Sequence, residues 1–221
     1  MLDRVNYIGN PNLGVFMRAN DKFALAPDGC SDRFSSILKK ALEVEVLKTS
    51  ISGTSLLGAM VAMNNKGIVL PKNVYKGEVK AFKGLGMNTT VLDDKLTALG
   101  NLLLVNDNGG IIGKNFTKKS KKKIEDTLDI EVESSMLADF RTVGAVGVAT
   151  NKGAVIHPMV TEEDLELVES LLKVYVDVGT INRGVGFVRT GLVANSNGAV
   201  MGQQTTGPEI ARIEDVFGFL E

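Results

Sequence analysis

Cysteine and histidine are nearly missing from this chain of 221 residues, which contains one of each and no tryptophan. A single cysteine cannot build an internal disulfide framework, and this fits a reducing compartment. A single histidine excludes every zinc centre that needs two histidine ligands. We therefore predict a protein without disulfide cross-links and without a metal site.

An excess of charge of either sign is also missing, because 25 Lys and Arg residues face 26 Asp and Glu residues, a net charge of −1. This balance excludes a polycation that binds nucleic acid through its overall field, so any such contact must come from a local patch. No apolar run reaches the ~18 residues of a membrane span, and no secretion signal opens the chain. We expect a cytoplasmic protein with neither a membrane nor DNA as a partner.

Glycine, in contrast, is abundant at 24 residues and recurs at a regular spacing. A turn rich in Asn and Asp occurs five times between apolar segments. The last residues of these turns are Phe23, Gly67, Gly109, Gly153 and Gly198. The steps between them are 44, 42, 44 and 45 residues. Five copies in register indicate one structural unit repeated along the chain.

A second series of glycines lies nine residues before the first four turn ends. Its members are Gly14, Gly58, Gly100 and Gly144. The fifth copy differs, because Arg189 stands at the corresponding position and Gly191 follows two residues later. We expect these glycines to lie where packing is tight or where φ is unfavourable for other residues.

Each copy predicts a β-hairpin, a helix and a further strand. Asn and Asp tolerate left-handed φ, and a turn of this kind between two apolar runs is typical of a hairpin. In the first copy Phe34, Leu38 and Leu42 fall on one helical face. Alternating β-rich segments then follow the first four helices, at residues 44–47, 89–92, 130–133 and 174–177.

The fifth unit has no trailing strand of its own. We expect residues 5–8 to supply this strand and so to close a ring. No Pro- or Ser-rich linker divides the chain, which favours a single domain spanning residues 1–221. The predicted fold class is therefore α/β, a closed, propeller-like array of five pseudo-repeats of about 44 residues.

Several segments resemble the translation initiation factor 6 family. They are residues 50–53, 65–71, 97–101, 151–158 and 180–184. The similarity covers the whole chain, and it implies the pentein fold, a pseudo-fivefold ring of α/β units. The chain ends at Glu221 without the polar tail of eukaryotic members, so it looks archaeal.

The resemblance also implies a function. Family members bind the large (50S) ribosomal subunit on the face that meets the small subunit, and so prevent premature joining. The docking surface lies beside ribosomal protein uL14 and near the sarcin–ricin loop of the rRNA. A role in translation initiation and in large-subunit maturation is expected, with a monomer as the working form. The resemblance implies no catalytic activity and no cofactor.

Five residues are candidates for contact with the ribosome. They are Asn10, Asn12, Gly100, Asn101 and Arg183. The family pattern places Asn101 on the ribosome-facing surface, whereas the alternative is an Asn that satisfies its own turn backbone. Arg183 offers a forked contact to phosphate or carboxylate, and its alternative is a salt bridge between units.

A run of five lysines also invites an RNA interpretation. It comprises Lys118, Lys119, Lys121, Lys122 and Lys123 at the start of a predicted helix. The run either touches rRNA phosphates or forms a solvated helix face, and the second interpretation is favoured. Asp126 lies four residues after Lys122, a spacing that offsets charge locally.

Cys30 and His157 carry the alternative function, a guanidinium-modifying enzyme of the same fold. Such a pair needs hydrogen-bond reach and a setting that favours the thiolate. The two residues fall in the first and fourth units, and the last unit has no cysteine. We therefore expect a protein that is not an enzyme.

Overall fold

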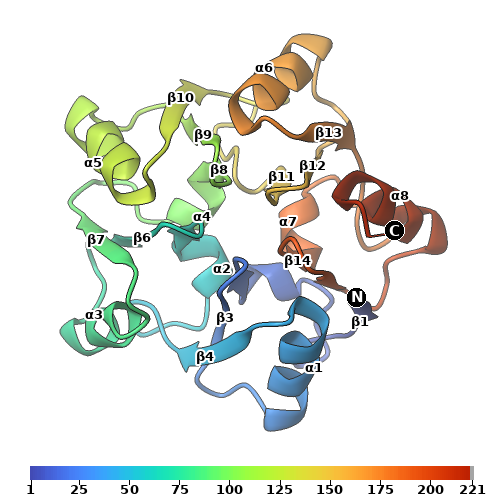
Figure 1. The fold of residues 1–221 in the computed structure, drawn as a ribbon, viewed down its shortest axis with the longest axis horizontal. Helices are drawn as coiled ribbons and strands as arrows, with labels where there is room; N and C mark the ends of the chain where they lie inside the picture. The colour runs from blue at the N-terminus through green and yellow to red at the C-terminus, as the bar shows by residue number, and fades with distance from the viewer. Residues whose placement is uncertain (220–221) are drawn as a thin grey trace.

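Five similar units surround a central axis in the computed structural model, which describes residues 1–219 (Figure 1). In this part of the chain the strands form five three-stranded sheets. The first hairpin strands are β2 (Arg18–Ala19), β5 (Ala62–Met63), β8 (Leu103–Val105), β11 (Gly147–Ala149) and β14 (Leu192–Ala194). The second hairpin strands are β3 (Phe23–Pro27), β6 (Gly67–Pro71), β9 (Gly109–Gly113), β12 (Gly153–Ile156) and β15 (Ala199–Met201).

One long helix per unit lies at the perimeter of the ring (Figure 1). These outer helices are α1 (Asp32–Leu42), α3 (Lys76–Lys83), α5 (Lys118–Leu128), α6 (Glu162–Leu172) and α8 (Gly207–Phe217). The first four lead to the third strand of a sheet. These third strands are β4 (Glu45–Thr49), β7 (Asn88–Leu92), β10 (Glu131–Ser135) and β13 (Tyr175–Val178), and in the fifth sheet the same place is taken by β1 (Leu2–Arg4) from the first residues of the chain.

All five sheets share one topology. In the second unit β6 pairs antiparallel with β5 and parallel with β7, so Val69 lies between Ala62 and Thr90. The outer helix makes the crossover that a parallel pair requires. The predicted α/β fold of five repeated units is therefore confirmed, and the first four trailing strands lie within two residues of their predicted positions.

The strand that closes the ring is not the predicted one. Leu2–Arg4 pairs parallel with β15, whereas residues 5–8 were expected to do so. Val5 adds one last hydrogen bond, from its N–H to the Met201 carbonyl at 2.9 Å, and the chain then leaves the sheet. Tyr7 takes a buried place, 5.2 Å from Phe16 and 5.3 Å from Phe34 between ring centroids. Burial of this aromatic side chain thus ends the strand early.

A capping box begins α6. In α6 the Asp164 N–H donates to the Thr161 hydroxyl at 3.1 Å, and the Asp164 carboxylate accepts the Thr161 N–H at 3.2 Å. The reciprocal pair of a capping box therefore forms with Asp in place of Glu. The apolar face of α1 is buried as predicted at Phe34, Leu38 and Leu42.

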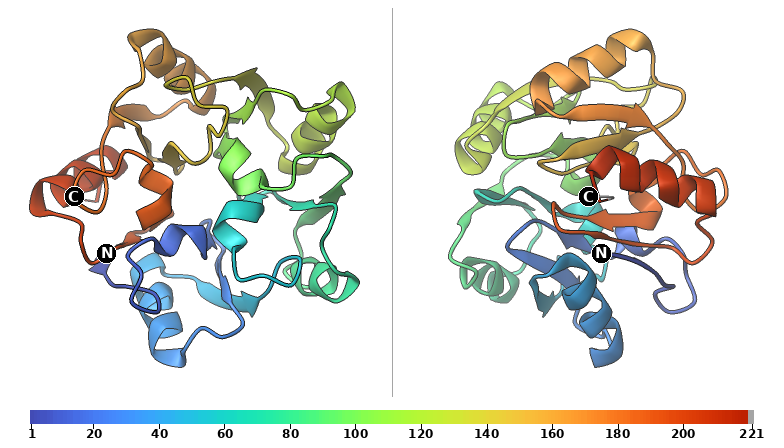
Figure 2. Two further views of the ribbon diagram at one scale, coloured as in Figure 1. Left: turned by 180° about the vertical axis from the view of Figure 1, so that it is seen from behind. Right: turned by 45° about the vertical axis from the view of Figure 1, so that its right-hand side comes forward.

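Short helices line the axis on the face seen from behind (Figure 2, left). They are η1 (Leu13–Val15), α2 (Leu57–Met60), α4 (Leu99–Leu102) and α7 (Val188–Gly191). We call this side the short-helix face. Each of the four repeated glycines packs on the backbone of the preceding unit. A Cβ added at Gly58 would lie 1.9 Å from the Gly14 carbonyl oxygen, and one at Gly100 would lie 2.1 Å from that of Gly58.

Hairpin turns surround the axis on the opposite face. Asn side chains there connect neighbouring units, because Asn20 donates to the Asn64 carbonyl at 2.8 Å and Asn64 donates to the Asn106 carbonyl at 3.2 Å. Asn195 joins the fifth unit to the first by donating to the Asn20 carbonyl at 3.0 Å. Thr150 replaces the Asn in the fourth unit and bonds within its own turn. Among residues 1–219, no helix is long and apolar enough to cross a membrane.

Candidate functional site

Asn101 lies in α4, one of the helices of the short-helix face. Its backbone carbonyl accepts the N–H groups of Gly144 and Ala145, at 2.9 and 3.2 Å, so the main chain is held by the next unit. The side chain is half-buried, and within residues 1–219 its amide makes no hydrogen bond. A rigid backbone with an unpaired amide group is suited to contact a partner.

Gly100 is buried, in contrast, with its Cα against the Gly58 carbonyl. It has no side chain and little surface of its own, so its place in the structure is to hold α4 close to α2. Of the two residues, Asn101 is the one that offers polar atoms.

Asn10 and Asn12 precede η1 and are both half-buried. The Asn10 side chain accepts the Asn12 N–H at 2.9 Å, and the Asn10 N–H donates to the Tyr7 carbonyl at 2.9 Å. Asn10 therefore stabilises its own turn, in the way that Asn commonly does. Asn12 is the N-cap residue of η1 but makes no side-chain capping bond.

Arg183 is exposed at the tip of the turn that precedes α7. Its φ is +67°, and that of Asn182 is +52°, both in the left-handed region. In residues 1–219 the guanidinium forms no ion pair, so the expected alternative of a salt bridge between units is not observed. The structure thus leaves the positive charge of Arg183 in solvent.

A carboxylate at the start of α8 holds the Arg183 turn. Glu209 accepts the N–H groups of Gly184 and Arg183, at 2.8 and 3.2 Å, and the Thr180 hydroxyl at 2.8 Å. It also accepts the Thr206 N–H at 2.7 Å. Burial alone would raise the pKa of Glu209, but these hydrogen bonds to the ionised form outweigh it, and the pKa lies below its ordinary value.

The same device recurs in other units, and the sequence analysis missed it. Glu78 at the start of α3 accepts the N–H groups of Ser52 and Gly53, at 2.8 and 2.9 Å. Asp164 accepts the Ala138 N–H at 3.0 Å. The third unit inverts the pair, since the Ser120 hydroxyl of α5 donates to Asp94 in the loop before α4. The sequence signal for this contact is the acidic residue at the third position of the outer helix.

The lysine run lies on α5 at the perimeter, away from the short helices around the axis (Figure 1). Lys122 pairs with Asp126 at 2.9 Å, as its spacing predicted, and Lys121 approaches Glu125 at 3.9 Å. Exposed pairs of this kind contribute little free energy. The run therefore forms a solvated helix face with part of its charge offset.

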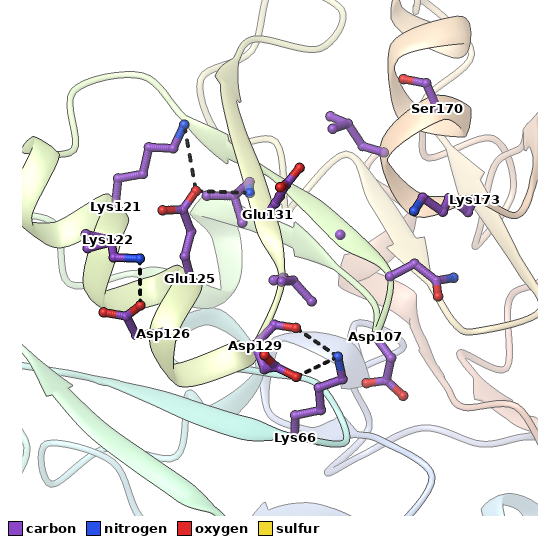
Figure 3. Close-up of a pocket in the computed structure, with 15 residues that line it drawn as sticks. Lys66, Asp107, Lys121, Lys122, Glu125, Asp126, Asp129, Glu131, Ser170 and Lys173 are labelled. Carbon is purple, nitrogen blue, oxygen red and sulfur yellow. Dashed lines mark hydrogen bonds and ion pairs between the residues drawn. The ribbon is translucent and has the colours of Figure 1, made fainter.

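A cleft of about 960 Å³ opens between α5 and the C-terminal end of α6 (Figure 3). Charged side chains line it, and most of those drawn point toward a partner of opposite sign. Lys66 pairs with Asp129 at 3.1 Å. The pairs Lys121–Glu125 and Lys122–Asp126 stand on α5, which forms one wall of the cleft. Few apolar groups line it, so the cleft is a solvent-filled groove where the second, third and fourth units meet.

Cys30 and His157 do not form a pair. Cys30 is buried in the core under α1, and its thiol is directed to the Ser31 carbonyl at 3.7 Å. His157 lies between Phe140 and Phe187, and its Nδ1 accepts the Met159 N–H at 3.1 Å. Burial raises the pKa of the Cys30 thiol and lowers the pKa of His157. The thiolate and the proton-accepting partner that catalysis requires are therefore not assembled here.

Comparison with protein families gives one match over nearly the whole chain. Residues 2–216 match the model described as the eIF-6 family. Translation initiation factor 6 of Thermococcus onnurineus (strain NA1) is 38% identical over 226 residues, which cover 100% of this chain and 99% of that protein. Translation initiation factor 6 of Methanocaldococcus jannaschii is 39% identical over 227 residues, again covering 100% and 99%.

Solved structures with the same fold are enzymes of low sequence identity. A cyanobacterial arginine dihydrolase, ArgZ, superimposes through its N-terminal domain with a TM-score of 0.51 at 15% identity, covering 80% of this chain and 79% of that chain. A dimethylarginine dimethylaminohydrolase gives a TM-score of 0.50 at 12% identity, covering 76% and 68%. At such identities the likeness concerns the fold alone, which is the pentein.

Proposed function

The chain belongs to the eIF-6 family, and from this premise we propose that it binds the large (50S) ribosomal subunit and prevents premature association with the small subunit. Its relatives named translation initiation factor 6 place it in translation initiation. The observation that carries the proposal is a match spanning residues 2–216, because a partial match would leave room for another activity.

The proposed contact surface is the short-helix face. Asn101 supplies an unpaired amide from a tightly packed helix, and Arg183 supplies an exposed guanidinium from a turn held by Glu209. Asn10 and Asn12 flank this surface in the first unit. Shape and a few polar groups would then hold the complex, which suits a chain with a net charge of −1.

The family resemblance suggests the partner in more detail. We propose that the surface docks beside ribosomal protein uL14 and near the sarcin–ricin loop, in the cytoplasm, and that residues 1–221 act as one monomeric domain. In that position the factor acts by steric exclusion and performs no catalysis. The separation of Cys30 from His157 supports a role without chemistry.

Sedimentation tests the proposal directly. The protein should migrate with isolated large subunits in a sucrose gradient and should lower the fraction of joined ribosomes in proportion to occupancy. Unchanged joining at saturating protein would contradict the proposal.

Asn101→Asp should weaken binding to large subunits by about tenfold, because a negative charge replaces the amide at the contact and about 1.4 kcal/mol corresponds to tenfold. Binding is measured by co-sedimentation over a range of factor concentrations. Asn73→Asp is the matched control, since it makes the same charge change at an exposed residue between β6 and the outer helix α3. Equal affinities for the two variants would remove Asn101 from the contact surface.

A further inference from the structure

A small cavity lies on the axis of the ring, inside the inner strands of the hairpins. Its volume is about 20 Å³, enough for one water-sized occupant. The wall is made by one residue from each unit, the last residue of each first hairpin strand. These wall residues are Ala19, Met63, Val105, Ala149 and Ala194. All five have apolar side chains, so the wall itself offers no polar side-chain partner to an occupant.

Two arginines also line this cavity, Arg18 and Arg189. Arg18 stands in β2, where the equivalent residues of the other units are apolar, namely Ala62, Leu104, Val148 and Val193. Its side chain is 4% exposed, and its Nη1 has no hydrogen-bond partner. Burial lowers the pKa of Arg18 to about 10, so the group stays charged at neutral pH.

Arg189 takes the place that glycine holds in the other four units. It is 6% exposed, and its Nε donates to the Gly144 carbonyl at 2.8 Å. This single bond occupies one of the five N–H groups of a guanidinium. Within residues 1–219 neither Arg18 nor Arg189 forms an ion pair. Two buried positive charges thus line one cavity without a carboxylate in contact with either.

The nearest acidic groups on the axis are otherwise engaged. Asp21 and Asp107 stand in the hairpin turns and line a second small pocket, which shares the five wall residues with the cavity. Both carboxylates accept hydrogen bonds from Asn65 and Asn151, at distances of 2.7 to 3.1 Å. Asp21 also accepts the N–H and hydroxyl of Ser196. These carboxylates join the five turns to one another, so the arginine charges below them remain uncompensated.

We propose that the axial cavity binds one small inorganic anion of halide size, held by the guanidinium groups of Arg18 and Arg189. A buried charge without a partner lowers the stability of the folded state. An anion on the axis would compensate the two positive charges and accept hydrogen bonds from guanidinium N–H groups that the apolar wall leaves unpaired. The cavity is too small for sulfate or phosphate. The site is independent of the proposed ribosome binding, since it lies inside the ring.

Thermal unfolding tests the proposal with chloride as the probe. Melting temperatures are compared in sodium chloride and in sodium gluconate at equal ionic strength, because gluconate is too large for the cavity. Chloride at about fivefold its dissociation constant should raise the Tm by about 2–4 °C, and the rise should saturate. Arg18→Met should abolish this rise, whereas Arg33→Met, the same change at an exposed helical residue, should keep it.

Crystals grown in sodium bromide give the second readout, which does not depend on any variant folding. One anomalous bromide peak is expected on the axis beside Arg18. No peak, with equal melting temperatures in chloride and gluconate, would mean that the cavity holds water only and would overturn the proposal. A peak without a chloride-dependent Tm would mark an adventitious ion and would overturn it as well.

Discussion

At the residue scale, the ring depends on positions where no side chain fits. Gly14, Gly58, Gly100 and Gly144 each place a Cα against the carbonyl of the unit before, and the closest approaches are to backbone atoms. Backbone cannot move aside as a long side chain does. The fifth unit has an arginine at this position. Arg189 donates a hydrogen bond to the Gly144 carbonyl, the group on which a glycine at this position would pack.

Gly58→Ala should therefore destabilise the protein by about 1–3 kcal/mol, because its Cβ would lie 1.9 Å from the Gly14 carbonyl oxygen and 2.5 Å from that of Met17. Urea unfolding gives the free energy, with the m-value as a check on two-state behaviour. Gly77→Ala is the control, since nothing lies within 4 Å of its Cβ and α3 should gain about 0.5–1 kcal/mol. Equal midpoints for the two variants would contradict this account.

At the element scale, the turns before α2 and α7, and the corresponding turn of the fourth unit, are attached to the outer helix of the same unit. Glu78, Asp164 and Glu209 accept N–H groups from these turns. Each of the three turns contains a non-glycine residue with positive φ, namely Ser52, Ala138 and Arg183. Left-handed backbone at residues such as Ala138 and Arg183 is unfavourable by itself. The carboxylates stabilise this left-handed backbone. In the fifth unit, Glu209 in this way holds the turn that carries Arg183 of the proposed contact surface.

Glu209→Gln should lower the free energy of unfolding by about 1.5–3 kcal/mol at pH 7, because a charge-assisted hydrogen-bond acceptor becomes neutral. The folded pKa of Glu209 lies below its ordinary value, so the unfolded state binds the proton at higher pH. Its contribution is present above the unfolded pKa of about 4.3 and is lost as pH falls through the folded pKa.

Unfolding free energies of wild type and variant between pH 3 and 7 measure this effect. Their difference should shrink toward the acid end of the range. Glu166→Gln, a change at an exposed position of α6, should show no such pH dependence. A constant difference at every pH would rule out the titration of Glu209 as its origin.

Sequence patterns predicted the repeated elements well because hairpin, helix and strand are set by local preference. The turn ends at Gly67, Gly109 and Gly153 all begin a second hairpin strand, as expected. The closing strand was misplaced by three residues, since burial of Tyr7 against two distant aromatic rings is a tertiary effect. The axial arginines were missed for the same reason, because nothing local to Arg18 indicates that it faces Arg189.

At the scale of the whole molecule, every unit touches two others, and the last touches the first through β1 (Figure 1). The Asn195 side chain also spans this junction, because it donates to the Asn20 carbonyl of the first unit. A substitution at the junction of the fifth and first units should therefore destabilise the whole ring and not one unit alone. Unfolding should be a single transition for this reason.

Val5→Pro tests that cooperativity, because it removes the N–H that donates to the Met201 carbonyl. The Tm should fall by about 2–4 °C per kcal/mol lost, as one transition seen equally by far-UV and near-UV circular dichroism. Val5→Ala keeps the N–H, so its Tm should fall by less than that of the Pro variant. Two separated transitions in the Pro variant would show that the fifth unit melts independently.

The closing strand has a consequence for synthesis. Leu2–Arg4 is made before the other strands of the ring, yet its partner Ala199–Met201 is made almost 200 residues later. Until that partner is made, at about 5–20 residues per second, the nascent chain carries Leu2–Arg4 as an unpaired strand. The first strand to be made must thus wait for a strand of the fifth unit, and the ring closes only after that unit has been synthesised.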